Sequence, residues 1–164
     1  MSERVSIRSY RETDAAALWE LKRGFELGLG IGGDDDKQRA YEGKLDETYQ
    51  QEYLSWVERC VEENERAVQV AEREGDLVGY VFVLPESLSY IWDAAVLNEV
   101  FVGEAYRGSG VGDRLMEAAL SVAREQSLPL DRIVLDVDRS NERARAFYER
   151  WGFEHWGEMV AREV

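Results

Sequence analysis

The sequence contains little cysteine, proline or lysine, and it has no long hydrophobic run. Its single cysteine, Cys60, excludes an internal disulfide and fits a reducing compartment. A run of about 18 apolar residues, which a membrane-spanning helix needs, is missing. The N-terminal residues Met1–Arg4 lack the apolar segment of a signal peptide. We therefore expect a cytoplasmic protein with no membrane partner.

Positive charge is also scarce, since 20 basic residues face 34 acidic ones and the formal net charge is −14. The basic residues include only three lysines, Lys22, Lys37 and Lys44. A strongly acidic surface disfavours nucleic acid and anionic lipid as partners. Because the carboxylates are spread along the whole chain, we interpret the acidity as adaptation to high salt rather than as a binding site for a cation.

With 164 residues, 45% of them hydrophobic, the chain is expected to form one domain, 1–164. The first half is expected to contain a strand over Val5–Tyr10, a helix with Ala17, Leu18, Leu21 and Phe25 on one side, a mobile loop over Gly24–Gly43, a helix over Asp46–Glu65, and a hairpin of Ala67–Ala71 and Leu77–Leu84. The second half is expected to contain a strand at Val100–Val102, a helix from Val111, a parallel strand over Arg132–Val137, a helix capped by Ser140, and a last strand over Phe153–Val160.

Three features that invite a chemical role are better explained structurally. The run Asp34–Asp36 lacks the spacing of a calcium loop, so we interpret it as a solvated loop and expect no metal. Cys60 lies on an apolar helical stripe and is expected to be a small core residue. The only histidine, His155, follows Phe153 in the expected last strand, and we interpret it as structural or exposed.

The stretch Leu97–Gly112 combines a strand, a glycine-rich loop and the start of an amphipathic helix. Glycines let a ligand approach the main chain, and a helix N-terminus offers unpaired N–H groups to an anion. The loop is not a P-loop, because Gly112 is followed by Asp113 rather than by Lys and Ser or Thr. It is not a dinucleotide fingerprint either, because the third glycine is missing. A pyrophosphate remains the ligand that such a loop suits.

The segment Arg107-x-x-Gly110-x-Gly112 resembles the acetyl-CoA loop of the GCN5-related N-acetyltransferase (GNAT) family. A second segment, Asn141-x-x-Ala144-x-x-Phe147-Tyr148 followed by Gly152-Phe153, resembles the other signature of that family. The resemblance implies an α/β fold, a mixed sheet with helices on both faces, in which acetyl-CoA lies where two parallel strands splay apart. The cofactor-binding positions that it implies are Val100, Val102, Arg107, Gly108, Ser109, Gly110, Val111, Gly112 and Asn141.

The resemblance further implies transfer of an acetyl group from acetyl-CoA to a primary amine. The matching tyrosine of the family often protonates the departing thiolate, so Tyr148 is a candidate catalytic acid, although its helical spacing equally fits a core residue. For the base that deprotonates the amine, Glu99 is the first candidate and Asp93 the second, and a base acting through water is an equal alternative. Main-chain N–H groups of the splayed strand, such as that of Val102, are candidates for stabilising the oxyanion.

The acceptor amine stays open at this stage, and both a small molecule and a protein or peptide amine are compatible with the sequence. In the family the acceptor is selected by segments that correspond to Phe25–Tyr49, Ser87–Asp93 and Phe153–Val160, and none of them carries a recognisable pattern. A homodimer is compatible with the resemblance, since dimers are common among relatives. Two other functions remain open: transfer of a longer acyl group, and a non-catalytic acyl-CoA sensor or partner-binding module.

Overall fold

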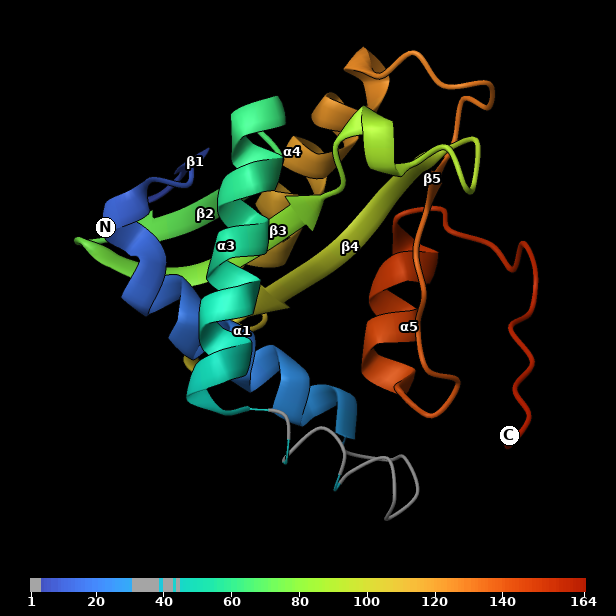
Figure 1. Cartoon of the computed structure of the whole chain (residues 1–164). Helices are drawn as coiled ribbons and strands as arrows, with labels where there is room; N and C mark the ends of the chain where they lie inside the picture. Colours follow the sequence, from blue (N-terminus) through green and yellow to red (C-terminus); the bar gives the residue numbers. More distant parts are fainter. Residues whose placement is uncertain (1–3, 31–38, 40–42, 44) are drawn as a thin grey trace.

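The computed structural model describes residues 4–30, 39, 43 and 45–164, and its centre is a five-stranded sheet (Figure 1). The strands follow one another across the sheet in chain order, and they are β1 Val5–Ser9, β2 Val68–Arg73, β3 Asp76–Val83, β4 Ala95–Val102 and β5 Ile133–Val134. The first four are antiparallel neighbours, whereas β4 and β5 are parallel. The expected mixed sheet and its parallel pair are therefore confirmed.

Helices cover both faces of the sheet, as expected (Figure 1). They are α1 Ala15–Gly30, α3 Glu47–Glu63, α4 Val111–Glu125 and α5 Glu142–Arg150. On one face α1 and α3 pack on alternate residues of the strands, including Tyr80 and Phe82. On the other face α4 packs on the intervening residues, including Val81 and Val83. This alternation is the period of two that a sheet buried on both sides requires.

Local signals in the sequence account for most of these elements. Asp46 accepts a hydrogen bond from the backbone N–H of Tyr49 and caps α3, whose stripe of Tyr53, Val57 and Cys60 is buried. The hairpin of β2 and β3 turns at Glu74 and Gly75, which both have positive φ. The expected core position of Cys60 is confirmed, and burial raises the pKa of its thiol to about 11. His155 is exposed.

Two expectations were wrong near the acceptor-selecting segments. Part of the expected loop, residues 24 to 30, belongs to α1; the rest, including Asp34–Asp36, lies outside the described residues. Gly24 lies against Phe101 of β4, where an added Cβ would come within 2.8 Å of the ring. A glycine that reads as a helix breaker therefore permits close packing of helix on strand. The buried face of α1 is also rotated from the expected one, since Ala17 is exposed while Lys22 and Glu26 are buried.

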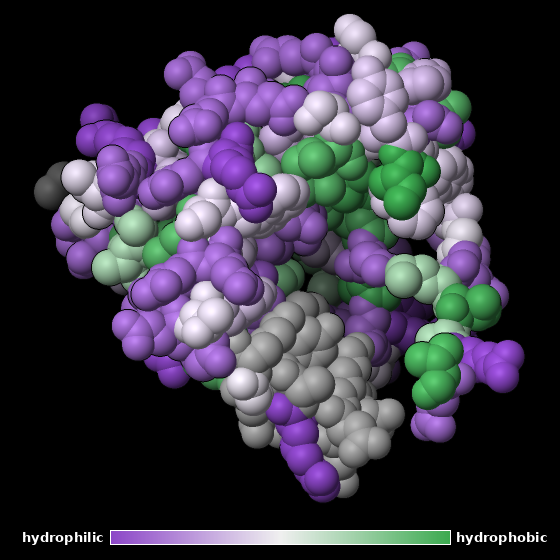
Figure 2. Space-filling view, viewed as in Figure 1, coloured by the Kyte–Doolittle hydropathy of each residue, from purple (hydrophilic) through white to green (hydrophobic). Residues whose placement is uncertain are grey.

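The C-terminal segment differs most from expectation. Residues 153–160 form no strand, and Figure 1 shows the chain after α5 running on without joining the sheet. A strand needs a partner backbone, and the adjacent edge strand β5 has only two residues, Ile133 and Val134, instead of the expected six. Met159 and Val160 are consequently exposed, and apolar side chains appear near this end of the molecule in Figure 2. Within the described part of the chain, no helix is long and apolar enough to span a bilayer.

Candidate functional site

The glycine-rich loop follows β4 through a short 3₁₀ turn, Glu104–Tyr106, and ends at the N-terminus of α4. Gly108 and Gly110 have φ values of 80° and 91°, which other residues rarely adopt, and Gly110 is the N-cap of α4. An added Cβ at either glycine would meet nothing within 4 Å, so the space beside the main chain is open. The first N–H groups of a helix have no partner within it and attract an anion. This geometry fits a pyrophosphate.

The other side chains of this loop are already used for packing or local bonds. Val111 is buried in the apolar cluster between α4 and the sheet. An added Cβ on Gly112 would lie 3.4 Å from the ring of Phe147 in α5. The Ser109 hydroxyl donates to the carbonyl of Tyr106. Any contribution of Ser109, Val111 and Gly112 to ligand binding would therefore come mainly from the backbone.

Strand β4 has an open edge beside this loop. Its pairing with β5 covers only Ala95 and Val96. The backbone N–H of Gly103 donates to the carbonyl of Val78 in β3. Because backbone groups alternate along a strand, those of Phe101 also point toward β3, whereas those of Val100 and Val102 point away from it, to the open edge. The Nε of Arg107 reaches this open edge and donates to the Val102 carbonyl at 3.0 Å. The splayed parallel pair expected from the resemblance is thus present, and the main-chain groups on its open edge belong to the two predicted valines.

Two guanidinium groups lie near the open edge and the glycine-rich loop. Arg107 lies over the Phe101 ring at 5.4 Å, and burial together with the nearby charge of Arg143 lowers its pKa. Arg143 belongs to the first part of α5. Two neighbouring cations repel each other, and an anion between them would relieve that repulsion. In a chain of net charge −14, this pair is a local exception that fits a phosphate group.

Tyr148 is held on α5 by the way that the helix ends. Gly152, with φ 87°, stops the helix as expected, and the backbone N–H groups of Gly152 and Phe153 donate to the carbonyls of Glu149 and Tyr148. The Tyr148 ring is packed edge-on against Phe147 and Phe153, at 5.6 and 5.7 Å. Burial raises its pKa to about 12. Among the described residues its hydroxyl has no hydrogen-bond partner, so it is available as a donor.

Asn141, and not Ser140 as expected, caps α5. Its Oδ1 accepts from the backbone N–H of Ala144, which leaves the amide nitrogen of Asn141 as a donor for a ligand. Ser140 instead donates through its hydroxyl and its backbone N–H to Asp138. The side chain of Asp138 shapes the turn before the helix and thereby moves the cap one residue along the chain.

A residue that sequence reasoning missed ties α5 to the loop. Asp113, in the first turn of α4, accepts from Arg150 and from the indole N–H of Trp151, both at 2.8 Å. The hydrogen bonds from Arg150 and Trp151 lower the pKa of the Asp113 carboxyl. This contact connects the helix that carries Tyr148 to the helix that begins at Gly110. In the sequence Asp113 is only one carboxylate among 34, so nothing distinguished it.

Glu99 lies on the opposite face of β4, within a buried polar network. Its Oε1 accepts from the hydroxyls of Tyr53 and Tyr80, each at 2.8 Å. Its Oε2 accepts from Lys22 at 3.1 Å and from the amide of Asn98 at 3.2 Å. A carboxylate offers about four acceptor positions, so all of those of Glu99 are used. Burial and the Glu99 charge raise the pKa of Tyr53 and Tyr80 well above its usual range, which keeps both hydroxyls protonated as donors.

Asp93, the second candidate base, lies elsewhere. It is exposed, has positive φ, and forms a turn just before the end of β4 that pairs with β5. Glu99 lies six positions further along the chain, which corresponds to about 20 Å of extended backbone. The structure therefore places Glu99 beside Val100, in the buried network under α1 and α3, and leaves Asp93 at the other end of the strand.

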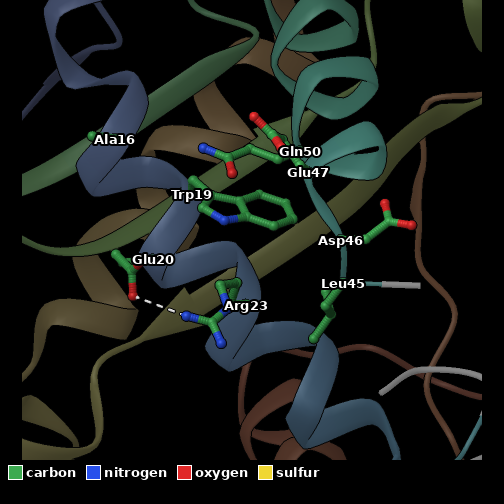
Figure 3. Close-up of a pocket in the computed structure, with 8 residues that line it drawn as sticks. All are labelled: Ala16, Trp19, Glu20, Arg23, Leu45, Asp46, Glu47 and Gln50. Atoms are coloured by element: carbon green, nitrogen blue, oxygen red, sulfur yellow. Dashed lines mark ion pairs between the residues drawn. The ribbon is translucent and has the colours of Figure 1, made fainter. Parts of the chain in front are cut away.

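An open pocket of about 510 Å³ lies between α1 and the start of α3 (Figure 3). Trp19 lies across it in Figure 3, and the pocket is lined by Ala16, Trp19, Glu20, Arg23, Leu45, Asp46, Glu47 and Gln50. Trp19 also contacts the ring of Tyr53, whose hydroxyl donates to Glu99. The pocket is thus separated from Glu99 by two aromatic side chains. It lies on the same side of the sheet as Glu99, and residues of the glycine-rich loop do not line it.

Comparison with known proteins indicates the same family as the two sequence motifs. The model of the acetyltransferase (GNAT) family matches residues 34–153. A relative named 5-NmdU N-acetyltransferase, from Pseudomonas phage PaMx11, is 31% identical over 105 residues, which cover 61% of this chain and 66% of the relative. The chain thus spans slightly less than two thirds of that relative's length.

Solved structures share the fold at low identity. PH1933 from Pyrococcus horikoshii OT3 has a TM-score of 0.72 at 20% identity, with 96% of this chain and 93% of that chain covered. PaiA N-acetyltransferase from Thermoplasma acidophilum, solved in complex with coenzyme A, has a TM-score of 0.71 at 19% identity, with 92% and 90% covered. The expected architecture is confirmed by these neighbours, and the family by the matching model. The chain belongs to the GNAT family of acetyltransferases.

Proposed function

We propose that this protein transfers an acetyl group from acetyl-CoA to a primary amine by direct attack of the amine on the thioester. One observation carries the proposal: Val100 and Val102 of the open β4 edge lie next to Glu99 along the strand and ahead of the glycine-rich loop, and they pack in the same apolar cluster as Tyr148. Acetyl-CoA supplies the activated acetyl group and a thiolate leaving group. The protein binds and orients acetyl-CoA and the amine, and it exchanges protons with them.

The binding role falls to the main chain. N–H groups of Gly108 to Gly112 face an anion at the α4 N-terminus, and Arg107 and Arg143 add positive charge. Arg107 occupies the Val102 carbonyl through a single hydrogen bond to an exposed side chain, which a ligand amide can replace. Holding thioester and amine in one orientation accounts for a large part of the expected rate acceleration.

The acceptor amine must lose a proton, because an ammonium with a pKa of about 10.4 is not a nucleophile. Glu99 is the proposed final acceptor of that proton. Since all its acceptor positions are used, the proton is proposed to arrive through a donor already bound to it, such as the Tyr53 hydroxyl, or through a water molecule that replaces one donor. In the first case Tyr53 takes the proton of the amine as it passes its own to Glu99.

Tyr148 is proposed to stabilise the departing thiolate. With a pKa of about 12, its hydroxyl remains protonated throughout the physiological range. A thiol has a pKa of about 8.5, so complete transfer from this phenol to the thiolate is unfavourable. A charge-assisted hydrogen bond from Tyr148 to the sulfur is therefore the larger part of its proposed role, and the proton of the product thiol comes finally from solvent.

The acceptor is proposed to approach from the α1 and α3 side, where the pocket beside Trp19 lies (Figure 3). Arg23 pairs with Glu20 at the rim, and Asp46 and Glu47 leave the pocket with a net negative charge, which favours a positively charged amine over a neutral or anionic acceptor. Both small-molecule amines and the amines of proteins or peptides meet that requirement.

The test is to mix the protein with acetyl-CoA and a panel of amines and to measure release of free thiol. The panel contains a polyamine, an aminoglycoside, a lysine peptide and a peptide with a free N-terminus. The protein adds little background, because Cys60 is buried and its pKa is raised. Amine-dependent thiol release supports the proposal. Tight binding of acetyl-CoA without thiol release with any amine would contradict it and favour a sensor.

A further inference from the structure

The buried network around Glu99 contains one cation, Lys22, and two carboxylates. The Lys22 Nζ lies 2.6 Å from Glu26 Oε1 and 3.1 Å from Glu99 Oε2. All three residues are buried, with 4%, 2% and 7% of their surfaces exposed. Lys22 is one of only three lysines in the chain, and it lies on the face of α1 that packs on the sheet.

The ammonium is fixed by aromatic rings as well as by charge. Its nitrogen lies 5.0 Å from the centre of the Phe25 ring and 4.7 Å from that of Tyr53. Such contacts favour a cation over a neutral group and restrict where it can lie. Lys22 therefore links α1, α3 and β4 at one point beside the open edge of β4.

We propose that Lys22 is a positioning residue of this site, and that its ammonium keeps the Glu99 carboxylate ionised and fixed beside Val100. The inference rests on the proposed function, in which Glu99 receives the proton of the amine. Lys22 itself touches neither substrate and acts through Glu99 alone.

The charges around Glu99 explain why the cation is needed. The groups that face Glu99 are Lys22 of α1, Tyr53 of α3, Tyr80 of β3 and Asn98 of β4, with Glu26 of α1 on the far side of the ammonium. Without Lys22, two carboxylates would share a buried site whose other donors are neutral. Buried like charges favour uptake of a proton by one of them. A protonated Glu99 can no longer accept the proton of the amine.

The first test measures the Glu99 carboxyl directly and needs no acceptor. The ¹³Cδ resonances of labelled glutamate are followed against pH by NMR, and Glu99 is assigned by its loss in Glu99→Gln. In Lys22→Met we expect the Glu99 resonance to titrate at a higher pH than in the wild-type protein. Lys22→Arg should restore the wild-type titration, since the charge returns. An unchanged Glu99 titration in a folded Lys22→Met protein would overturn the proposal.

The second test asks whether this ionisation matters for chemistry. The rate kcat/KM with acetyl-CoA is measured against pH for the best amine of the panel. Because the ionisation of the amine is common to all variants, a difference between variants belongs to the protein. The acidic limb should move to higher pH in Lys22→Met and return in Lys22→Arg. A Glu99 titration moved to higher pH with an unmoved rate profile would overturn the positioning role.

A control variant separates the effect of removing the charge beside Glu99 from the effect of losing any ion pair. Arg66 pairs with Glu125 at 2.6 Å, far along the chain from Glu99, and Arg66→Met removes a cation without touching the network. It should leave both the Glu99 titration and the rate profile unmoved. If Lys22→Met does not fold, Lys22→Gln removes the charge while keeping a hydrogen-bond donor. A wild-type protein inactive with every amine would contradict the proposed function, whereas the NMR titration would still decide whether Lys22 holds Glu99 ionised.

Discussion

The two sides of β4 are built in opposite ways. On the α1 and α3 side, Glu99 lies in a buried network in which the protein itself supplies every partner of the carboxylate. On the α4 and α5 side, the backbone edge at Val100, the space beside Gly110 and the Tyr148 hydroxyl are left for a ligand to meet. In the proposed mechanism, the group that accepts the proton is therefore organised before substrates bind, whereas the leaving-group side is completed by acetyl-CoA.

The largest expected effect on the rate comes from a change at Glu99, on the side of β4 where the protein supplies every partner. Glu99→Gln should lower kcat by about 10²- to 10⁴-fold, the usual range for loss of a general base. The measurement is kcat on folded protein, with the melting temperature recorded beside it, because a buried carboxylate in an ion pair also contributes to stability.

Glu26→Gln is the matched control for this change. It removes the other carboxylate bound to Lys22, at comparable burial, and leaves Glu99 paired. We expect a similar loss of stability and less than about a tenfold loss of rate, which is below the range for a general base. Equal losses of rate in both variants would mean that the network is only structural.

On the open side, Gly110→Val should weaken acetyl-CoA binding by at least about 100-fold, as expected when two charge-assisted hydrogen bonds are lost. Its φ of 91° is unfavourable for valine, and its Cβ would enter the open space beside the loop. Gly75→Val is the control, because Gly75 has nearly the same φ, 87°, and equally open surroundings, but it belongs to the hairpin of β2 and β3 rather than to the loop. Calorimetry that finds equal acetyl-CoA affinity in the two variants would contradict the loop assignment.

Tyr148→Phe should lower kcat by a smaller factor, about 10- to 100-fold, which corresponds to one hydrogen bond to a charged group, about 1.5–3 kcal/mol. The substitution keeps the ring between Phe147 and Phe153, so the melting temperature should hardly change. A larger loss, 10³-fold or more, would show that complete proton transfer from Tyr148 limits the rate. No loss, with chemistry limiting, would make Tyr148 a core residue alone.

The smallest expected effect is that of salt on the melting temperature, through the charged surface of the protein. With a net charge of −14, the melting temperature should rise by a few degrees as KCl is increased to molar concentration, because salt screens repulsion between exposed carboxylates. The buried pair of Lys22 and Glu99 is shielded from salt, so its double-mutant coupling energy should stay constant. A melting temperature independent of KCl would show that the acidity is not an adaptation to salt.

Sequence reasoning succeeded where a short segment carries its own signal. The turn at Gly75 and the stop at Gly152 each follow from local backbone chemistry, and both are confirmed, as is the start of a helix at Asp46. The two motifs identified the loop and α5 in the same way. Sequence reasoning failed at residues 24–30 and 153–160, because whether those segments become helix or strand depends on a partner. That partner is Phe101 in the first case and the two-residue strand β5 in the second.

The sequence by itself determined the family, the order of the elements as far as α5, and the candidate roles of Glu99 and Tyr148, because these depend on local spacing and on motifs of a few residues. Only the tertiary structure decided what surrounds them. Lys22 and Glu99 are 77 residues apart, and their ion pair exists because α1 packs across β4. From the sequence, Lys22 is only a charged residue within an amphipathic helix. Its role depends on its burial and on the opposite charge of Glu99, which only folding brings next to it.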